Sequence, residues 1–302
     1  MALLTRRALL RGVASAGVAG IGTGAYAAVI EPGLRLRIAE YRPALPAWPA
    51  DHALKIAVLA DIHAGEPYMP LVRVERIVDT ANNLNPDLIV ILGDFAANHR
   101  FMTRSLVHRD VARTLAALRA PLGVHAILGN HDWWDDPDAI NTRGATRPAW
   151  DRALREAGVP VMENAALRIV HAGRAFWLLG LGDLWAFHHG PDGHWQGADD
   201  LSGTLAQLTD DAPAILLTHE PDIFPRMPAR VSLTLAGHTH GGQVRLFGYS
   251  PVIPSDYGNR FAYGHIVEGG RHMIVSGGLG MSVYPVRLGV PPEIMLVRLG
   301  GA

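Results

Sequence analysis

Five short apolar runs of this chain end at Asp, Asn or His residues, and this pattern constrains the fold more than any other feature. The first run covers residues 54–60 and leads into Asp61 and His63. The second covers residues 87–92 and leads into Asp94. The other three are residues 123–128 before Asn130, His131 and Asp132, residues 214–218 before His219, and residues 232–236 before His238 and His240. Runs of this length and composition predict buried β-strands.

Helical patterns separate the first three runs, within residues 70–84 and 105–118. Strands that alternate with helices indicate parallel βαβ units whose strands are buried on both faces. The second half of the chain is mostly strand-like, with Gly or Pro in the turns. Its predicted strands are residues 167–170, 175–181, 213–218, 232–236, 243–247, 272–275 and 293–299. We therefore expect one large α/β domain in which a second, mixed sheet packs on the first.

Ligand-binding sites of open α/β sheets lie beyond the carboxyl ends of the strands, so the five termini should converge on one rim. At a strand end, Asp61 and His63 are two residues apart and should point to the same side. Gly93 allows close backbone approach, and Asp94 offers two oxygens that can bridge two metal ions. Each motif alone has a simpler explanation as a loop, turn or cap residue. Their coincidence in one chain favours a metal site.

Composition restricts the chemistry of that site. The chain has no Cys, which excludes disulfides, thiolate zinc sites and cysteine nucleophiles. A metal must therefore be bound by His, Asp, Asn or Glu. The formal net charge of -1 provides no basic field for a polyanion, so we expect no nucleic acid partner.

The N-terminus is typical of a targeting segment. Arg6 and Arg7 precede an uncharged, glycine-containing run at residues 12–30, as in a twin-arginine export signal, and residues 25–27 offer a small-residue cleavage site. An ordinary secretory signal or an uncleaved membrane anchor are the alternatives. We predict a signal or anchor at residues 1–28, a linker or edge segment at 29–51 and the domain at 52–302. Such a protein is exported to the periplasm or cell envelope, with possible membrane association through this segment.

The series Asp-x-His, Gly-Asp, Gly-Asn-His-Asp, His and Gly-His-x-His resembles the calcineurin-like metallophosphoesterase family over about residues 54–240. Residues 237–243 and the tail at 276–280, 285–287 and 291–293 resemble the exported bacterial members, which carry a twin-arginine signal or are membrane-associated. The resemblance implies a four-layer α/β/β/α sandwich of two mixed sheets flanked by helices.

The resemblance also implies a dinuclear metal centre with seven ligands. One ion would be held by Asp61, His63 and His240, the other by Asn130, His219 and His238, with Asp94 bridging. Oxygen and imidazole ligands suit Mn, Fe or Zn without selecting one. Two such ions lower the pKa of a bridging water to give the attacking hydroxide. His131 is the candidate general acid, with Asp132 or another carboxylate orienting its ring.

The sequence departs from the family at one point, because Phe95-Ala96-Ala97-Asn98 stands where a second aspartate is common. The predicted activity is hydrolysis of a phosphodiester or phosphomonoester, with an envelope lipid or wall polymer as candidate substrate. A catalytically silent binding or scaffold protein is the alternative, although all seven ligands and His131 are present. A nucleotide-binding module would need a glycine-rich loop after the first strand, and residues 61–66 do not provide one.

Other residues near the predicted rim have two readings each. Asp183 could enter the site or serve a turn, and the tryptophans could form a wall for an apolar leaving group or simply pack. The arginines could bind phosphate or be surface charges, and the loop histidines could face substrate or solvent. These residues are Asp183, Trp133, Trp134, Trp185, Arg245, Arg260, Arg287, His188, His189 and His194.

Overall fold

The computed structural model describes residue 17, residues 20–97, residue 99, residues 101–188, residue 190 and residues 193–301. Most of the predicted export signal, including Arg6 and Arg7, lies outside this part of the chain, and so do Asn98 and His189. Within the described part, no helix combines the length and apolar character needed to cross a membrane.

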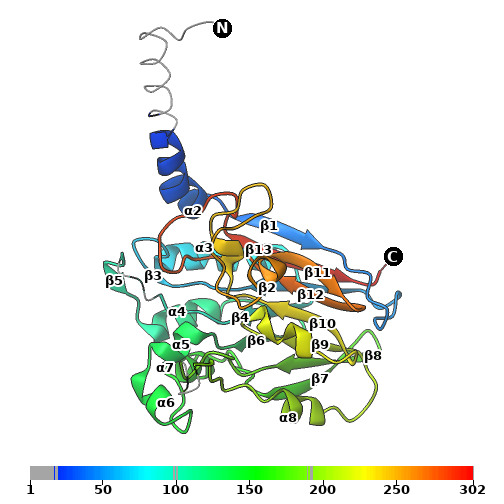
Figure 1. Cartoon of the computed structure of the whole chain (residues 1–302). Helices are drawn as coiled ribbons and strands as arrows, with labels where there is room; N and C mark the ends of the chain where they lie inside the picture. The colour runs from blue at the N-terminus through cyan, green and yellow to red at the C-terminus, as the bar shows by residue number, and fades with distance from the viewer. Residues whose placement is uncertain are drawn as a thin grey trace, which may run out of the picture.

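The first sheet has five strands in the order β1-β13-β2-β4-β6 (Figure 1). Strands β2, β4 and β6 are parallel, whereas β13 is antiparallel to β2 and parallel to β1. The bounds are β1 Arg37–Tyr41, β2 Leu54–Leu59, β4 Leu88–Leu92, β6 Val124–Ile127 and β13 Glu293–Leu299. The order places β1, from the segment predicted as linker or edge, at the edge of this sheet.

The second sheet has six strands in the order β11-β12-β10-β9-β8-β7. Its four central strands run parallel, and β7 and β11 close the two edges as antiparallel strands. The bounds are β7 Ala165–His171, β8 Arg174–Gly180, β9 Ala214–Leu217, β10 Val231–Ala236, β11 Gly264–Glu268 and β12 Arg271–Val275. The runs predicted as strands after residue 160 form most of this sheet.

Three apolar cores separate four layers, which confirms the predicted α/β/β/α sandwich of two mixed sheets. Alternate residues of β2 show the arrangement: Ile56 and Val58 face the second sheet, and Ala57 and Leu59 face the helices. The outer face of the first sheet is covered by α3 (Leu71–Asn83), α4 (His108–Leu115) and α7 (Ala149–Glu156). The outer face of the second is covered by α8 (Leu201–Ala206) and η2 (Pro221–Arg226).

Short elements complete the described fold, and several of them were not predicted. They are η1 (Tyr26–Ile30), α2 (Glu31–Leu34), β3 (Gly65–Glu66), β5 (Arg104–Ser105), α5 (Asn130–Trp134), α6 (Pro137–Asn141), η3 (His240–Gly242) and η4 (Gly258–Phe261). The strand predicted at 243–247 is wrong. That segment makes only isolated bridges, and it turns back on itself through mutual backbone hydrogen bonds between Leu246 and Tyr249.

Candidate metal centre

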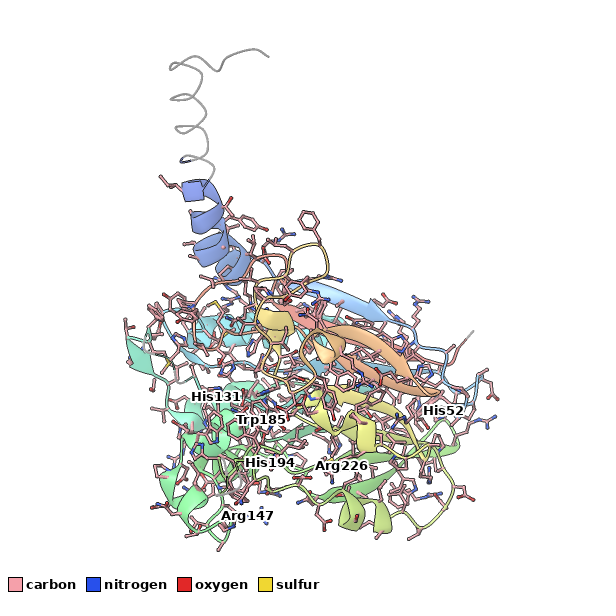
Figure 2. The ribbon with its side chains drawn as sticks, viewed as in Figure 1. His52, His131, Arg147, Trp185, His194 and Arg226 are labelled. Atoms are coloured by element: carbon pink, nitrogen blue, oxygen red, sulfur yellow. The ribbon has the colours of Figure 1, made fainter. Side chains whose placement is uncertain are left out.

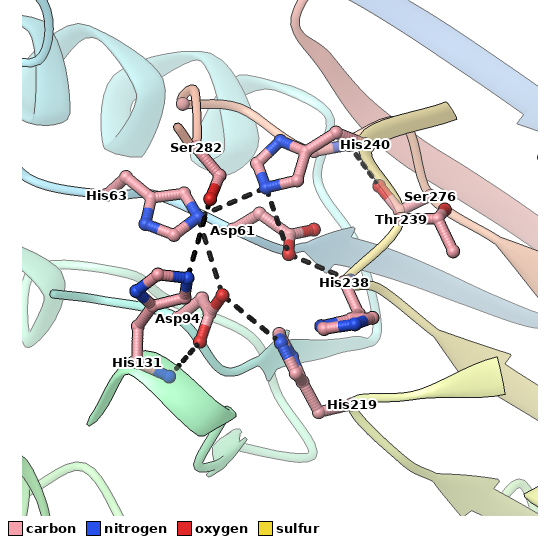
Figure 3. A network of polar contacts seen from close by, with 12 residues as sticks. Asp61, His63, Asp94, His131, His219, His238, Thr239, His240, Ser276 and Ser282 are labelled. Carbon is pink, nitrogen blue, oxygen red and sulfur yellow. Dashed lines mark hydrogen bonds and ion pairs between the residues drawn. The ribbon is translucent and has the colours of Figure 1, made fainter. Parts of the chain in front are cut away.

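The loops that follow β2, β4, β9 and β10 bring six of the seven predicted ligands together, as Figure 3 shows. The seventh, Asn130, follows β6 and contacts one of them. Two groups of side chains have their ligand atoms within 4.8 Å of one another. The first contains Asp61, His63, Asp94 and His240, and the second contains Asp94, His219 and His238. All of these side chains are buried. The convergence predicted from the strand ends is therefore present in the fold.

Asp94 belongs to both groups. Its Oδ2 lies 3.4 Å from His63 Nε2 and 3.2 Å from His219 Nε2. Its Oδ1 accepts a hydrogen bond from the backbone N–H of His131 at 2.9 Å. A carboxylate in this place can serve two adjacent cation sites at once.

In the first group, His63 Nε2 and His240 Nε2 lie 3.1 Å apart, and Asp61 Oδ1 lies 3.7 Å from His240 Nε2. Two imidazole nitrogens that face each other at this distance need a proton or a cation between them, because two lone pairs repel. In the second group, His238 Nδ1 lies 3.0 Å from Asn130 Oδ1. This contact brings Asn130 into the site.

Backbone carbonyls orient two of the imidazoles. His63 Nδ1 lies 2.7 Å from Ala96 O, and His219 Nδ1 lies 2.6 Å from Leu92 O. A carbonyl oxygen accepts a proton from Nδ1 and thereby leaves the Nε2 lone pair pointing into the site. Both Nε2 atoms are the ones directed at Asp94.

Five of the predicted ligands have a left-handed backbone. The φ angles are 53° at Asp61, 46° at His63, 55° at Asp94, 70° at His238 and 50° at His240. Our reason for expecting Asp61 and His63 on one side was wrong, because β2 ends at Leu59 and the alternation of a strand does not continue to them. Strained backbone of this kind costs about 1–3 kcal/mol per residue and persists only where the surroundings fix it.

Two glycines allow the loops after β4 and β6 to touch. A Cβ on Gly93, which has a φ of +84°, would lie 2.3 Å from the backbone nitrogen of Gly129. A Cβ on Gly129 would lie 2.3 Å from Asp94 Oδ1. These positions require glycine because the backbones of the two loops approach too closely for any side chain.

Asp132 has a different role from the predicted one. Its Oδ1 accepts hydrogen bonds from the backbone N–H groups of Phe95 and Ala96, and its Oδ2 accepts them from Asp94 and Gly129, all at 2.8–3.0 Å. The expectation that Asp132 orients the His131 ring is therefore wrong. Both oxygens are used to hold the loop that carries Asp94 against the start of α5.

His131 lies beside the first group, with its ring 5.0 Å from that of His63. Its Nε2 lies 3.4 Å from Ser282 Oγ, and its Nδ1 is buried and makes no hydrogen bond. Burial lowers the pKa of His131, and the charge of Asp94 opposes that effect. Ser282 was not identified from the sequence, because nothing in its neighbourhood distinguishes it from an ordinary loop serine.

The electrostatics of the site keep most of its imidazoles neutral. Burial lowers the pKa of His63 to about 3, and burial together with neighbouring imidazoles puts the pKa values of His238 and His240 well below the ordinary value. Burial opposes ionisation of Asp94, but the surrounding histidines, His219 first, lower its pKa well below the ordinary range. A neutral imidazole and an ionised carboxylate are the forms that bind cations.

Divalent cations fit these residues on two observations. Asp61 Oδ2 and His238 Nε2 are buried and make no hydrogen bond. Buried polar atoms without a partner are costly, and a bound cation would satisfy both. The donor set consists of carboxylate oxygens, an amide oxygen and imidazole nitrogens, which suits divalent transition metals.

An aromatic wall stands beside the site. Trp185 contacts the ligand His238 edge-on with ring centres 4.4 Å apart, and it stacks on Trp195 at 4.4 Å. Trp134 lies 5.3 Å from the ring of His131 and stacks on His188. Trp134 Nε1 donates to Trp185 O at 3.1 Å, which joins the two parts of the wall, and His131 and Trp185 are both labelled in Figure 2. Trp133, by contrast, is buried in the helix-side core.

Asp183 is buried next to Glu220, a residue that the sequence analysis missed. Glu220 Oε2 accepts a hydrogen bond from Leu184 N, and Asp183 Oδ1 accepts one from Trp185 N. Burial and the adjacent Glu220 carboxylate raise the pKa of Asp183 well above its ordinary value. Together with His219 these carboxylates form a third close group, which holds the chain that carries Trp185.

The arginines do not face the site as phosphate ligands. Arg287 is fully buried, donates hydrogen bonds to the carbonyls of Gly277 and Gly280, and contacts His240 Nδ1 at 3.2 Å. Arg260 pairs with Glu268 at the surface. Arg245 donates to Ser250. His194 is exposed in the loop after Trp185.

Known proteins with similar sequences carry the same kind of domain. The family model for calcineurin-like phosphoesterases matches residues 54–242. The chain is 32% identical to the uncharacterized metallophosphoesterase YkuE of Bacillus subtilis, with 99% of each chain covered. It is 30% identical to the phosphodiesterase YaeI of Escherichia coli, covering 98% of this chain and 100% of that one.

A third relative is the UDP-2,3-diacylglucosamine pyrophosphatase LpxG of Chlamydia trachomatis, at 27% identity over 91% of this chain and 92% of that one. The family model spans more than half of the chain, and its match begins at β2 and ends at η3, so it encloses all seven predicted ligands. The chain therefore belongs to the calcineurin-like phosphoesterase family and is a metal-dependent phosphoesterase.

Proposed function

We propose that this protein hydrolyses a phosphate ester at a centre of two divalent metal ions, Mn, Fe or Zn. The position of Asp94 between the two ligand groups is the observation that carries the proposal. Asp61, His63 and His240 would hold one ion, Asn130, His219 and His238 would hold the other, and Asp94 belongs to both groups. When bound, such ions activate water and neutralise charge on the phosphoryl oxygens.

The protein's own residues protonate the leaving oxygen and orient the bridging carboxylate. His131 is the general acid, because its ring stands next to the ligand groups and its Nε2 is directed towards Ser282 rather than towards a carboxylate. A positioned imidazole of this kind can donate a proton to a leaving oxygen. Asp132 fixes the backbone N–H groups around Asp94, so the bridging carboxylate keeps its orientation.

The substrate is a phosphodiester or phosphomonoester of the cell envelope, and the protein is exported, as an envelope lipid or wall-polymer esterase would be. The N-terminal Arg6-Arg7 pair with its uncharged run supports export. Trp134 and Trp185 form an apolar wall beside the centre, which supports a leaving group with an apolar or aromatic part.

The test is turnover of bis-p-nitrophenyl phosphate and p-nitrophenyl phosphate by the metal-loaded chain and three variants. Asp94→Ala should abolish turnover. His131→Ala should reduce it by about 10²–10⁴-fold for esters with poor alkyl leaving groups and much less for p-nitrophenyl esters, since a good leaving group needs no proton. His108→Ala is the matched control, because His108 is one-third exposed, pairs with Asp135 and belongs to neither ligand group.

An equal loss for good and poor leaving groups would remove His131 from the role of acid. A chain that binds two equivalents of metal but hydrolyses no ester would favour the second candidate function, a metal-dependent binding or scaffold protein. The matched control shows whether a loss of turnover in Asp94→Ala or His131→Ala reflects chemistry or damage to the fold.

A further inference from the structure

Large apolar side chains are exposed on a tight turn that follows η3. Within seven residues, Leu246, Phe247, Tyr249 and Val252 each expose half or more of their surface, and Phe247 is fully exposed. Backbone hydrogen bonds between Leu246 and Tyr249 close the turn and hold these side chains outward. We call residues 243–253 the apolar hairpin. Scattered exposed apolar residues are ordinary, but a concentration of this kind marks an interaction surface.

The apolar hairpin is joined to the N-terminal helical segment, residues 20–34, through the chain before β13. Arg245 N donates to Leu288 O, and Leu288 N donates to Gln243 O, both at 2.8 Å. The residue before Leu288, Arg287, donates its backbone N–H to Ala27 O at 2.8 Å. Figure 1 shows the amber hairpin and the red segment before β13 reaching the base of the blue helix.

The N-terminal helical segment adds its own exposed apolar side chains to the same end of the molecule. Ile21, Val29, Ile30 and Leu34 are exposed there, and Val283 is exposed on the chain before β13. Across residues 20–36, 243–253 and 279–292 the one acidic residue is Glu31, and it is buried. The surface is thus apolar, carries Arg35 and Arg245, and presents no carboxylate to a partner.

We propose that the N-terminal helical segment, the apolar hairpin and Val283 form one surface that docks on a lipid bilayer. A bilayer with anionic headgroups matches apolar side chains flanked by arginines and free of carboxylates. The uncharged run at residues 12–30 ends in this surface, which gives the folded domain and the N-terminal segment the same partner.

The surface is connected to the metal centre. Ser282, next to Val283, lies 3.4 Å from His131 Nε2 and donates its backbone N–H to Gln243 of the apolar hairpin at 2.7 Å. The substrate is therefore an amphiphilic phosphate ester that stays in the bilayer while its phosphate enters the site. This statement of substrate class rests on the proposed phosphoesterase function, whereas the docking itself does not.

The absence of Cys from the natural sequence allows a direct test with the full chain. Phe247→Cys carries an environment-sensitive fluorophore, and Val170→Cys is the matched control. Val170 is an exposed apolar residue of the edge strand β7, which lies at the opposite end in Figure 1. With vesicles of phosphatidylcholine and phosphatidylglycerol, the label at 247 should shift to shorter wavelength and be quenched by lipid-chain quenchers. The label at 170 should not respond.

A label at 247 that stays in water while the chain sediments with vesicles would overturn the proposal. A shift that depends on protein concentration without vesicles would also overturn it, in favour of a second copy of the chain as partner.

A second measurement separates docking from catalysis. Phe247→Ser/Val252→Ser should bind vesicles at least about a hundredfold more weakly than the natural chain, because each of the two large apolar side chains removed from water strengthens binding about tenfold or more. It should keep its turnover of soluble bis-p-nitrophenyl phosphate and lose turnover of a phosphate-ester lipid in vesicles. Leu167→Ser/Val170→Ser on β7 is the control and should change neither.

Equal vesicle turnover by both double variants would overturn the delivery of substrate from the bilayer. Insertion of the label at 247 without turnover of any ester would leave the docking surface standing and refute the phosphoesterase proposal instead.

Discussion

Replacement of Asp132 by asparagine tests the construction of the metal centre without touching a predicted ligand. Each oxygen of Asp132 accepts two backbone N–H groups, from Phe95 and Ala96 on one side and from Asp94 and Gly129 on the other. In Asp132→Asn an NH₂ group replaces one oxygen. Whichever way the amide turns, two buried N–H donors then lose their acceptor and face another donor.

The expected cost follows from that count. A buried donor left without an acceptor costs about 1–3 kcal/mol, so two of them lower the free energy of unfolding by about 2–6 kcal/mol. This is a large part of the about 5–15 kcal/mol that stabilises a typical domain. The matched control is Asp135→Asn at the C-terminal cap of the same short helix. Its side chain is one-third exposed and pairs with His108, and such a pair contributes about 0–1 kcal/mol.

Urea denaturation of the natural chain and both variants, with chelator and with added Mn, measures the effect. Asp132→Asn should unfold at a clearly lower urea concentration in both conditions, because its contacts are to the backbone and not to a cation. Unfolding of Asp132→Asn at the same urea concentration as Asp135→Asn would refute the four-bond network. A loss of stability confined to the metal-loaded state would make Asp132 a participant in metal binding instead.

Three further predictions are also tested by unfolding measurements. In thermal unfolding, a chelator should lower the melting temperature, because Asp61 and His238 then keep buried atoms without partners, and added Mn should raise it. A melting temperature that responds to neither would contradict the metal site. Gly93→Ala should destabilise strongly, whereas alanine at Gly248, which also has a positive φ but an open Cβ position, should cost much less. Burial lowers the pKa of His52 in the folded chain. Below about pH 6.5 the unfolded chain therefore binds a proton that the folded chain does not bind, and the free energy of unfolding decreases as the pH decreases, by up to about 1.4 kcal/mol per pH unit. His52→Phe should make the stability change between pH 7 and 5 smaller, and an unchanged slope would exclude His52 as a contributor.

The strands and the place of the site could be predicted because both depend on local patterns and one general rule. Runs such as residues 88–92 are too apolar and too short for anything but a buried strand, and the ends of parallel strands meet at one edge. The residues after the strands then had to lie together. No knowledge of loop geometry was needed for that conclusion.

The conformations of the loops could not be predicted in the same way. The left-handed φ angles of Asp61 and His63 are fixed by contacts with residues distant in sequence, such as the bonds from Asp61 N to Gly93 O and from His63 N to Asp94 O. The role of Asp132 depends on the Asp94–Ala96 loop more than thirty residues away. The burial of Arg287 likewise follows from carbonyls that only the folded chain brings around it.

Arg287 also shows why the end of the segment predicted as a signal or anchor, and the segment predicted as a linker, matter to the site. Its side chain holds Gly277 and Gly280 and reaches His240, while its backbone is bonded to Ala27. Burial lowers the pKa of Arg287 to about 10, and the buried carboxylate of Glu31 opposes that effect together with Asp61 and Glu293. Strand β1 pairs with β13 along five residues. Residues 27–41 therefore support His240 through packing and charge, although none of them is a predicted metal ligand. The same residues lead into the apolar surface, so the part of the chain that would meet a bilayer is fixed to the part that would hold the metal.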